Sequence, residues 1–270
     1  MKIVLWVGNE SNQQALANKI QALYPIAGIV TESRKHKPKI TLTKLFEKVI
    51  EKLFLSDIGK SWMGMKSFYE KKYPAFPATK IIDVENINSP VVFDFTKEIN
   101  PDLIIVSGTS LIKEQLLKLK PTIGIINLHT GLSPYIKGGP NCTNWCIATK
   151  QFHLIGNTIM WIDKGIDTGN IITTALTSFT GDEDLLEIHI KVMEHAHSLY
   201  LKAIDFLAKG GSSNIPQSEI VKGTTYYSKQ WGLKEKINLI RNMEAFRHSI
   251  KNGKTEKLRL HVKTVAIILN

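Results

Sequence analysis

Near its middle the chain reads Ile125-Ile126-Asn127-Leu128-His129-Thr130-Gly131-Leu132-Ser133-Pro134, and this stretch decides the fold. Its apolar run predicts a buried strand over Gly124–Leu128, and the glycine and proline that follow predict a loop. Side chains two positions apart point to the same face of a strand, so Asn127 and His129 are expected to project together. Ligands of open α/β sheets bind beyond the carboxyl ends of the strands. This strand end is therefore the first candidate for a functional site.

A second polar turn follows, and it reads Asp163-Lys164-Gly165-Ile166-Asp167-Thr168-Gly169. It lies between the segments Asn157–Ile162 and Asn170–Thr177, which are predicted to be strands joined by the turn. We expect Asp167 to return toward the strand end that carries Asn127 and His129. An amide donor, an imidazole and a carboxylate that meet there suit polar chemistry on a carbonyl group.

The rest of the chain alternates between apolar strand patterns and amphipathic helix patterns. Strands are predicted over residues 2–8, Ile26–Val30, Ile81–Val84 and Leu103–Val106. Helices are predicted over Ser11–Leu23 (capped by Ser11 or Asn9), Thr43–Leu55, Val91–Ile99, Lys113–Lys118, Pro140–Thr149 (with Pro140 near its first position) and Asp184–Lys209. This order predicts an α/β fold, a Rossmann-like, mostly parallel twisted sheet with flanking helices. A linker, Gly210–Ser213, precedes a small basic C-terminal appendage. The first turn lacks G-x-G-x-x-G, so a dinucleotide is not indicated.

Three basic segments fit this alternation less well. Thr31–Lys39 is predicted to be a basic loop. Trp62–Phe76 is aromatic and basic, and it is expected to be an insertion or lid outside the core. Its Trp62–Tyr73 part, like Tyr226–Trp231, could stack a base and hold phosphates, or could form a lid or a dimer surface.

Composition limits the class of protein. The chain has 270 residues with 43% hydrophobic and 22% charged, as in a globular protein with a real core. The net charge of +11 favours phosphates, nucleic acid or an anionic membrane surface as partners, although a basic solvated surface explains it equally well. No apolar run reaches the roughly eighteen residues that a membrane span needs. The only cysteines, Cys142 and Cys146, form no disulfide framework, so a reducing cytoplasm is the expected location.

Other catalytic or metal-binding patterns are weak. His189, His195 and His197 share a helix, but no two are four apart, so the H-x-x-x-H zinc pattern is absent. They are expected to be surface or helix-packing histidines. Cys142 and Cys146 are expected to be partly buried thiols. The G-x-S-x-G pattern of a serine nucleophile is missing, and no metal site is predicted.

Asn127-Leu128-His129, Leu132-Ser133-Pro134, Lys137-Gly138 and Asp163-x-Gly165-x-Asp167-Thr168-Gly169 together resemble the folate-dependent formyltransferases. That family includes methionyl-tRNA formyltransferase, glycinamide ribonucleotide formyltransferase and the nucleotide-sugar N-formyltransferases. The resemblance is most specific over residues 102–175, extends over 1–208 through the order of the elements, and is weak beyond. It implies a catalytic domain over residues 1–209. Residues 210–270 would form a small C-terminal region that binds substrate or makes a homodimer.

The resemblance implies 10-formyltetrahydrofolate as the formyl donor and Asn127, His129 and Asp167 as the catalytic residues. When an amine attacks a formyl carbon, negative charge builds on the formyl oxygen and is stabilised by hydrogen-bond donors. The amine must also lose a proton, and an imidazole with a pKa of about 6.5 is suited to that transfer. Whether His129 or another group is the primary base stays open. The implied folate-binding residues are Ser107, Gly108, Thr109, Ser110, Leu111 and Asp163.

Two positions depart from the family pattern. Many members carry an arginine near Ser110, and this chain lacks it. Lys137 stands before Gly138 where an arginine is more usual, so the lysine replaces it or the acceptor differs.

The expected acceptor of the formyl group is inferred from the length and composition of the C-terminal segment. Transfer RNA formylation relies, in the family, on a sizeable C-terminal barrel, and the glycinamide enzyme typically ends near the long helix. The short tail and the aromatic, basic segments favour a nucleotide-linked deoxyamino sugar, whose product would feed lipopolysaccharide O-antigen or another surface glycan. The alternatives are a glycinamide ribonucleotide or methionyl-tRNA formyltransferase-like enzyme, or a non-catalytic nucleic-acid-binding protein. No stable nucleic-acid partner and no membrane insertion are expected.

Overall fold

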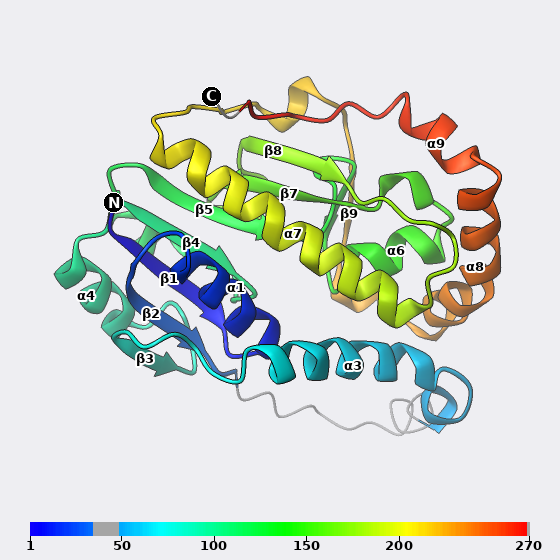
Figure 1. Cartoon of the computed structure of the whole chain (residues 1–270), viewed down its shortest axis with the longest axis horizontal. Helices are drawn as coiled ribbons and strands as arrows, with labels where there is room; N and C mark the ends of the chain where they lie inside the picture. Colours follow the sequence, from blue (N-terminus) through cyan, green and yellow to red (C-terminus); the bar gives the residue numbers. More distant parts are fainter. Residues whose placement is uncertain (35–48, 269–270) are drawn as a thin grey trace.

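A computed structural model of the chain describes residues 1–34 and 49–268, and these fold around a seven-stranded sheet (Figure 1). Its strands are β1 (Ile3–Gly8), β2 (Ile26–Glu32), β3 (Ile81–Val84), β4 (Leu103–Ser107), β5 (Gly124–His129), β7 (Gly156–Trp161) and β8 (Ile171–Leu176). Their order is β3-β2-β1-β4-β5-β7-β8. The first five pair in parallel, and β7 and β8 add as antiparallel strands. The predicted fold class is confirmed.

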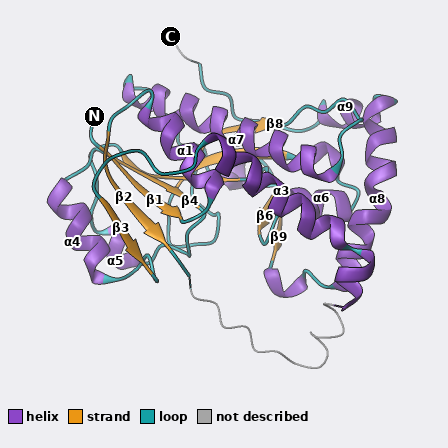
Figure 2. Cartoon of the chain, turned by 60° about the horizontal axis from the view of Figure 1, so that its bottom comes forward, coloured by secondary structure: helices purple, strands orange, loops and turns teal. Residues whose placement is uncertain are grey.

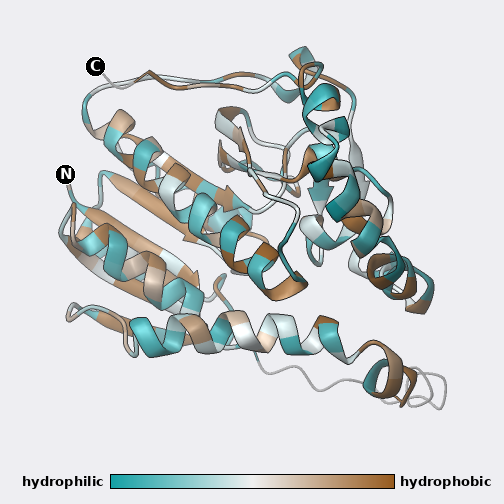
Figure 3. Cartoon of the chain, turned by 45° about the vertical axis from the view of Figure 1, so that its right-hand side comes forward, coloured by the Kyte–Doolittle hydropathy of each residue, from teal (hydrophilic) through white to brown (hydrophobic). Residues whose placement is uncertain are grey.

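Helices cover both faces of the sheet (Figure 2). On one face, α1 (Ser11–Gln21) and α7 (Leu185–Ala208) pack on the strands through side chains such as Leu16, Ile20 and Tyr200. On the other face lie α4 (Pro90–Ile99) and α5 (Glu114–Leu117), which bury Val92 and Leu116. The central strands β1, β2 and β4 are buried on both sides, whereas edge strand β3 is partly exposed, and the sheet is mostly hydrophobic in Figure 3.

The strand β5 is fixed by α7 before it reaches the predicted site. The Tyr200 hydroxyl donates to the Ile126 carbonyl oxygen at 2.8 Å, and it lies 3.1 Å from the Val106 carbonyl oxygen. Tyr200 is fully buried, so these bonds are shielded from water. They tie the long helix to β4 and β5, the two strands whose ends carry the site.

The prediction for Trp62–Phe76 was wrong. Residues Ser56–Lys72 form a regular helix, α3, that packs along α1 and α7. Met65 and Tyr69, four residues apart, are fully buried in that contact. This spacing places both on one face of a helix, so α3 is part of the core and only its other face is basic.

Helix ends differ from expectation in three places. Neither Ser11 nor Asn9 caps α1, because its N-cap is Glu10 and the Ser11 hydroxyl donates to the Lys66 carbonyl oxygen at 2.7 Å. The helix α6 (Cys142–Ala148) begins two residues after Pro140, with the Asn141 side chain as its cap. The predicted helix over Lys113–Lys118 is shorter and spans Glu114–Leu117.

The remaining predictions agree with the described elements or fall partly outside them. Asp184 caps α7 through a capping box, as the acidic start of that helix suggested. The predicted helix Thr43–Leu55 is helical over residues 49–54, and its earlier part lies outside the described residues. So do Lys35, Lys37 and Lys39 of the predicted basic loop.

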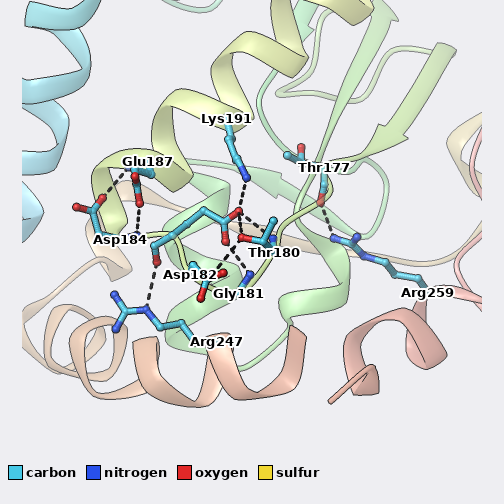
Figure 4. Close-up of polar contacts among 10 residues, drawn as sticks. Thr177, Thr180, Gly181, Asp182, Asp184, Glu187, Lys191, Arg247 and Arg259 are labelled. Carbon is cyan, nitrogen blue, oxygen red and sulfur yellow. Dashed lines mark hydrogen bonds and ion pairs between the residues drawn. The ribbon is translucent and has the colours of Figure 1, made fainter. Parts of the chain in front are cut away.

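Residues after Gly210 pack against the preceding part of the chain. They contain β9 (Thr224–Tyr226), α8 (Leu233–Lys251), α9 (Lys254–Arg259) and two short 3-10 helices, Gln217–Glu219 and Ser228–Gln230. The strand β9 pairs with β6 (Ile136–Gly138), and α8 lies on α6. In Figure 4, Arg247 of α8 and Arg259 of α9 reach the loop after β8, where they donate to the carbonyl oxygens of Glu183 and Thr177.

The last described residues return along the outer edge of the sheet (Figure 1). The Thr174 amide donates to the Val265 carbonyl oxygen at 2.8 Å, so this segment covers part of edge strand β8. None of the described helices has the length and apolar character needed to cross a membrane.

Candidate active site

A cavity of about 360 Å³ opens at the carboxyl ends of β4 and β5. The loop after β4 forms one wall, and the turn between β7 and β8 forms the opposite wall. The lining residues are Arg34, Val106, Gly108, Thr109, Ser110, Leu111, Ile112, Asn127, Gly138, Met160, Trp161, Ile162, Asp163, Gly165, Ile166, Asp167, Thr168 and Gly169. This is the place where open α/β sheets bind their ligands.

Asn127 lines the cavity from the end of β5. It is half-buried, and its side-chain amide makes no hydrogen bond to any residue that the structure describes. The amide is therefore available to donate to an oxygen atom of a bound molecule, without a proton to lose or gain.

His129 lies behind Asp167 and does not line the cavity. Its Nδ1 is 3.3 Å from Asp167 Oδ2, and its Nε2 lies 3.4 Å from the Ile136 carbonyl oxygen and 3.5 Å from Cys142 Sγ. The ring is buried, with 8% of the residue exposed. The predicted meeting of imidazole and carboxylate is thus present, with the carboxylate nearer to the cavity.

This pairing determines the charge of His129. Burial alone lowers the pKa of the imidazole, but the Asp167 carboxylate, the Cys142 sulfur and the Ile136 carbonyl oxygen together outweigh burial and raise that pKa to about 10. Burial raises the pKa of the neighbouring Cys142 thiol, so the thiol stays neutral at pH 7. The pairing with Asp167 therefore favours the imidazolium form of His129, which supplies positive charge beside the cavity.

Asp167 is held on a strained turn. Its backbone φ is +52°, a left-handed conformation that aspartate tolerates better than most residues. Asp167 Oδ2 also accepts the Gly138 amide at 3.1 Å, while Oδ1 has no hydrogen bond within the described part of the chain. A Cβ at Gly169 would lie 1.8 Å from the Trp161 carbonyl oxygen, so the turn passes too close to β7 for any other residue there.

Asp163 organises the same turn. Its Oδ1 accepts the Gly165 amide at 2.9 Å and the Thr168 hydroxyl at 2.7 Å. The side chain is exposed and the residue lines the cavity. The Asp163 carboxylate therefore stabilises the turn, a structural role in addition to the folate contact predicted for Asp163.

The opposite wall, the loop Ser107–Ile112, is held by Glu32 at the end of β2 and by Arg34 just after that strand. The Ser110 amide donates to Glu32 Oε2 at 2.6 Å, and Glu32 Oε1 accepts the Ile87 amide at 2.9 Å. Glu32 is buried, with 3% of the residue exposed. The Arg34 guanidinium donates to the Gly108 carbonyl oxygen at 2.9 Å and lies 3.5 Å from Glu32 Oε2.

The structure brings most of the predicted site residues to one cavity. Gly108, Thr109, Ser110, Leu111, Asp163, Asn127 and Asp167 line it, whereas Ser107 and His129 are buried beside it. Sequence analysis missed Arg34, which places a guanidinium on the wall where an arginine near Ser110 was expected and is missing. No local sequence pattern indicates that Arg34 belongs to the site, because its contact with Gly108 joins residues 74 positions apart.

Of the other histidines and cysteines noted in the sequence, His195 is partly buried and the rest are buried within the fold. His189 Nε2 lies 2.9 Å from Asn144 Oδ1, and burial lowers the pKa of His189 to about 4. His197 is likewise buried, and burial lowers its pKa to about 3. Cys142 and Cys146 are free thiols more deeply buried than expected. Within residues 1–34 and 49–268, no three His, Cys, Asp or Glu side chains are grouped to hold a metal ion.

Comparison with known proteins decides the family. The sequence family described as formyl transferase matches residues 1–204. The chain belongs to this family. The resemblance that the sequence predicted is confirmed, and members of this family are folate-dependent N-formyltransferases whose formyl donor is 10-formyltetrahydrofolate.

Sequence relatives of this formyl transferase are methionyl-tRNA formyltransferases. The one from Clostridium botulinum is 32% identical over 157 residues, which cover 58% of this chain and 47% of the relative. The one from Sulfurihydrogenibium is 23% identical and covers all of this chain and 82% of the relative. The chain thus spans about half the length of the first of these curated relatives.

Solved structures with the same fold include two kinds of formyl transferase. A sugar N-formyltransferase from Shewanella has a TM-score of 0.59 and 15% identity, with 90% of this chain and 88% of that chain covered. A phosphoribosylglycinamide formyltransferase from Streptococcus pneumoniae has a TM-score of 0.52 and 16% identity, with 77% of this chain and 99% of that chain covered. At these identities the likeness establishes the fold.

Proposed function

We propose that this formyl transferase moves a formyl group from 10-formyltetrahydrofolate to the amine of a nucleotide-linked deoxyamino sugar. The product would feed a surface glycan such as lipopolysaccharide O-antigen. One observation carries the proposed reaction: the Asp167–His129 pair lies beside the unengaged Asn127 amide at the cavity. The cytoplasmic location, the division of the chain at residue 209 and a possible homodimer stay part of the proposal.

The cavity suits the folate donor. Val106, Ile112, Met160 and Ile162 give apolar walls, and the loop Gly108–Leu111 lines the cavity with them. A flat heteroaromatic ring fits such a site, because apolar walls cover its faces while backbone groups can pair with its polar edge. Ser107 is buried beside the loop and positions it from the end of β4.

The chemistry follows from the charges of three side chains. Asn127 can donate a hydrogen bond to the formyl oxygen as negative charge develops there, a contribution typically worth about a hundredfold in rate. The His129 imidazolium adds positive charge next to the cavity. Because His129 already carries its proton, the proton of the attacking amine goes to Asp167 Oδ1 directly or through water. The new C–N bond forms at the formyl carbon, and the bond from that carbon to the donor nitrogen breaks as the donor nitrogen takes up the proton that Asp167 accepted.

The acceptor is inferred from the C-terminal region. Of the described residues after Gly210, only Thr224–Tyr226 form a strand, and this strand joins β6 beside the site. The solved sugar N-formyltransferases are matched over 90% of this chain, while the glycinamide enzyme is matched over 77%. An N-formyltransferase from Helicobacter canadensis, described in complex with folinic acid and dTDP-3-aminofucose, is matched over 92% of this chain. These matches support a sugar acceptor.

Methionyl-tRNA is the second candidate acceptor. It is favoured by the sequence relatives, and the net charge of +11 suits a polyanion. Glycinamide ribonucleotide follows, since enzymes that use it share the fold. A non-catalytic nucleic-acid-binding protein would have no use for the Asp167–His129 pair.

The acceptor is tested by offering a panel to the purified chain with 10-formyltetrahydrofolate. The panel holds dTDP-, UDP- and GDP-linked amino sugars, glycinamide ribonucleotide and charged initiator methionyl-tRNA. We expect formylation of at least one nucleotide-linked sugar, detected by mass spectrometry. Turnover of glycinamide ribonucleotide or of the tRNA alone would replace the sugar proposal. Salt-sensitive RNA binding without any folate-dependent turnover would replace the enzymatic one.

A further inference from the structure

The turn that carries Asp167 is held from the C-terminal region by one side chain. Gln217 Nε2 donates to the Asp167 carbonyl oxygen and to the Gly169 carbonyl oxygen, each at 2.8 Å. Gln217 begins the 3-10 helix Gln217–Glu219 and lies outside the residues 1–204 that match the family. A single amide group thus spans the turn on both sides of Thr168.

Gln217 is itself fixed in place. Ile215, two residues before Gln217, pairs with Ile171 of β8 through two backbone hydrogen bonds of 2.8 and 2.9 Å. Gln217 is buried, with 8% of the residue exposed, so water competes weakly for its amide. The sheet edge therefore acts as a rigid support from which Gln217 reaches the turn.

The turn needs such support. A left-handed φ is unfavourable for a non-glycine residue such as Asp167, and it persists only where the surroundings enforce it. The Asp163 carboxylate braces the start of the turn through Gly165 and Thr168. Gln217 braces its other end, where Asp167 must point its carboxylate at His129 Nδ1 over 3.3 Å.

We propose that Gln217 is a positioning residue for the reaction: its amide holds the Asp163–Gly169 turn in the conformation that presents Asp167 to His129. The C-terminal region is then part of the catalytic apparatus and not only a surface for the acceptor. The proposal rests on the proposed function through the roles of Asp167 and His129. Gln217 lies beyond residues 1–204, so this role falls outside the part of the chain that matches the family.

The test replaces Gln217 by methionine, which has similar size and no donor. We expect kcat to fall about tenfold, since small misplacement of catalytic groups has effects of this order or larger. We also expect NMR titration of the His129 ring to move toward the ordinary imidazole pKa, because Asp167 is no longer held at ion-pair distance. The conservative Gln217→His variant keeps one N–H donor and should recover part of both losses.

Asn242 offers a matched control. Its buried amide also links the C-terminal region to the catalytic portion by donating to two carbonyl oxygens, those of Ile147 and Ala148, at 3.0 and 2.9 Å. Asn242→Leu should lower thermal stability without moving the His129 titration.

Two results would overturn the positioning role. One is an unchanged His129 titration and a kcat within twofold of wild type in folded Gln217→Met. The other is an equal effect of Gln217→Met and Asn242→Leu on kcat and on the titration. If Gln217→Met does not fold, the same comparison is made with Gln217→His. The titration needs no substrate, so it tests Gln217 even if no acceptor in the panel is formylated.

Discussion

The two walls of the cavity are held in different ways. The loop Ser107–Ile112 depends on two charged side chains at and just after the end of β2, since Glu32 accepts two backbone amides and Arg34 donates to Gly108. The turn Asp163–Gly169 carries the reactive carboxylate and is braced by Asp163 within it and by neutral Gln217 from the C-terminal region. The first wall is suited to shaping a binding surface. The second wall is suited to fixing a charge. Substitutions in the first wall should therefore affect binding of the donor, and substitutions in the second wall should affect turnover.

The largest effect should come from Asp167→Asn, which removes the charge and keeps the size. We expect turnover to fall by about a hundredfold or more, because both the ion pair with His129 and the proton acceptor are lost. The Kd of the donor, measured by isothermal titration calorimetry, should change by less than threefold, because the substitution leaves the Ser107–Ile112 wall intact. Wild-type turnover in this variant would contradict the role of the second wall.

Glu32→Gln should have the next largest effect, and on the other wall. An amide in place of the carboxylate keeps one acceptor oxygen and turns an NH2 group toward Ile87 or Ser110, so one buried backbone amide loses its partner. We expect KM for the donor to rise about tenfold and stability to fall by about 1–3 kcal/mol, with kcat nearly unchanged. Steady-state kinetics and urea unfolding measure these quantities. A loss confined to kcat would mean that the two walls are not functionally distinct.

The pH dependence should reveal the His129–Asp167 pair. The folded-state pKa of His129 is raised to about 10, above its ordinary value of about 6.5, so the pair's contribution to stability is fully present below about pH 6.5. That contribution is lost as the pH rises through about 10, and kcat should decline over the same range because the imidazolium is lost. Asp167→Asn should abolish this limb of the profile. Thermal unfolding and kcat measured from pH 6 to 10.5 check both statements.

Thr168→Val should have the smallest effect. It removes the hydroxyl that donates to Asp163 at 2.7 Å, while the Gly165 amide and Gln217 still hold the turn. We expect kcat to fall only about twofold to threefold, in line with the loss of one exposed hydrogen bond. A loss as large as that of Asp167→Asn would show that Asp163, rather than Gln217, fixes the turn.

Sequence patterns were sufficient where local signals exist. The apolar runs predicted the strands that carry Ser107 and Asn127, and the turn residues predicted the position of Asp167. They misled at Trp62–Phe76, where aromatic and basic residues masked the buried spacing of Met65 and Tyr69. The four-residue spacing of Met65 and Tyr69 is itself a helical signal in the sequence.

Other features had no local signal at all. Arg34 and Gln217 contact their walls across 74 and 50 positions of sequence, and such contacts arise only when the chain has folded. The strand Thr224–Tyr226 is three residues long and exists because it pairs with Ile136–Gly138. The charge of His129 likewise depends on a partner brought from another turn. Long-range pairing, and not residue type, decides these parts of the site.

The most direct test of the account follows the formyl carbon itself. The chain is incubated with 10-formyltetrahydrofolate labelled with ¹³C in the formyl group and with the amine panel, and labelled formamide is detected by NMR. We predict a labelled formamide on a nucleotide-linked amino sugar with the wild-type chain and about a hundredfold less with Asp167→Asn over the same time. No labelled product with any amine, or equal yields from the two proteins, would contradict the account.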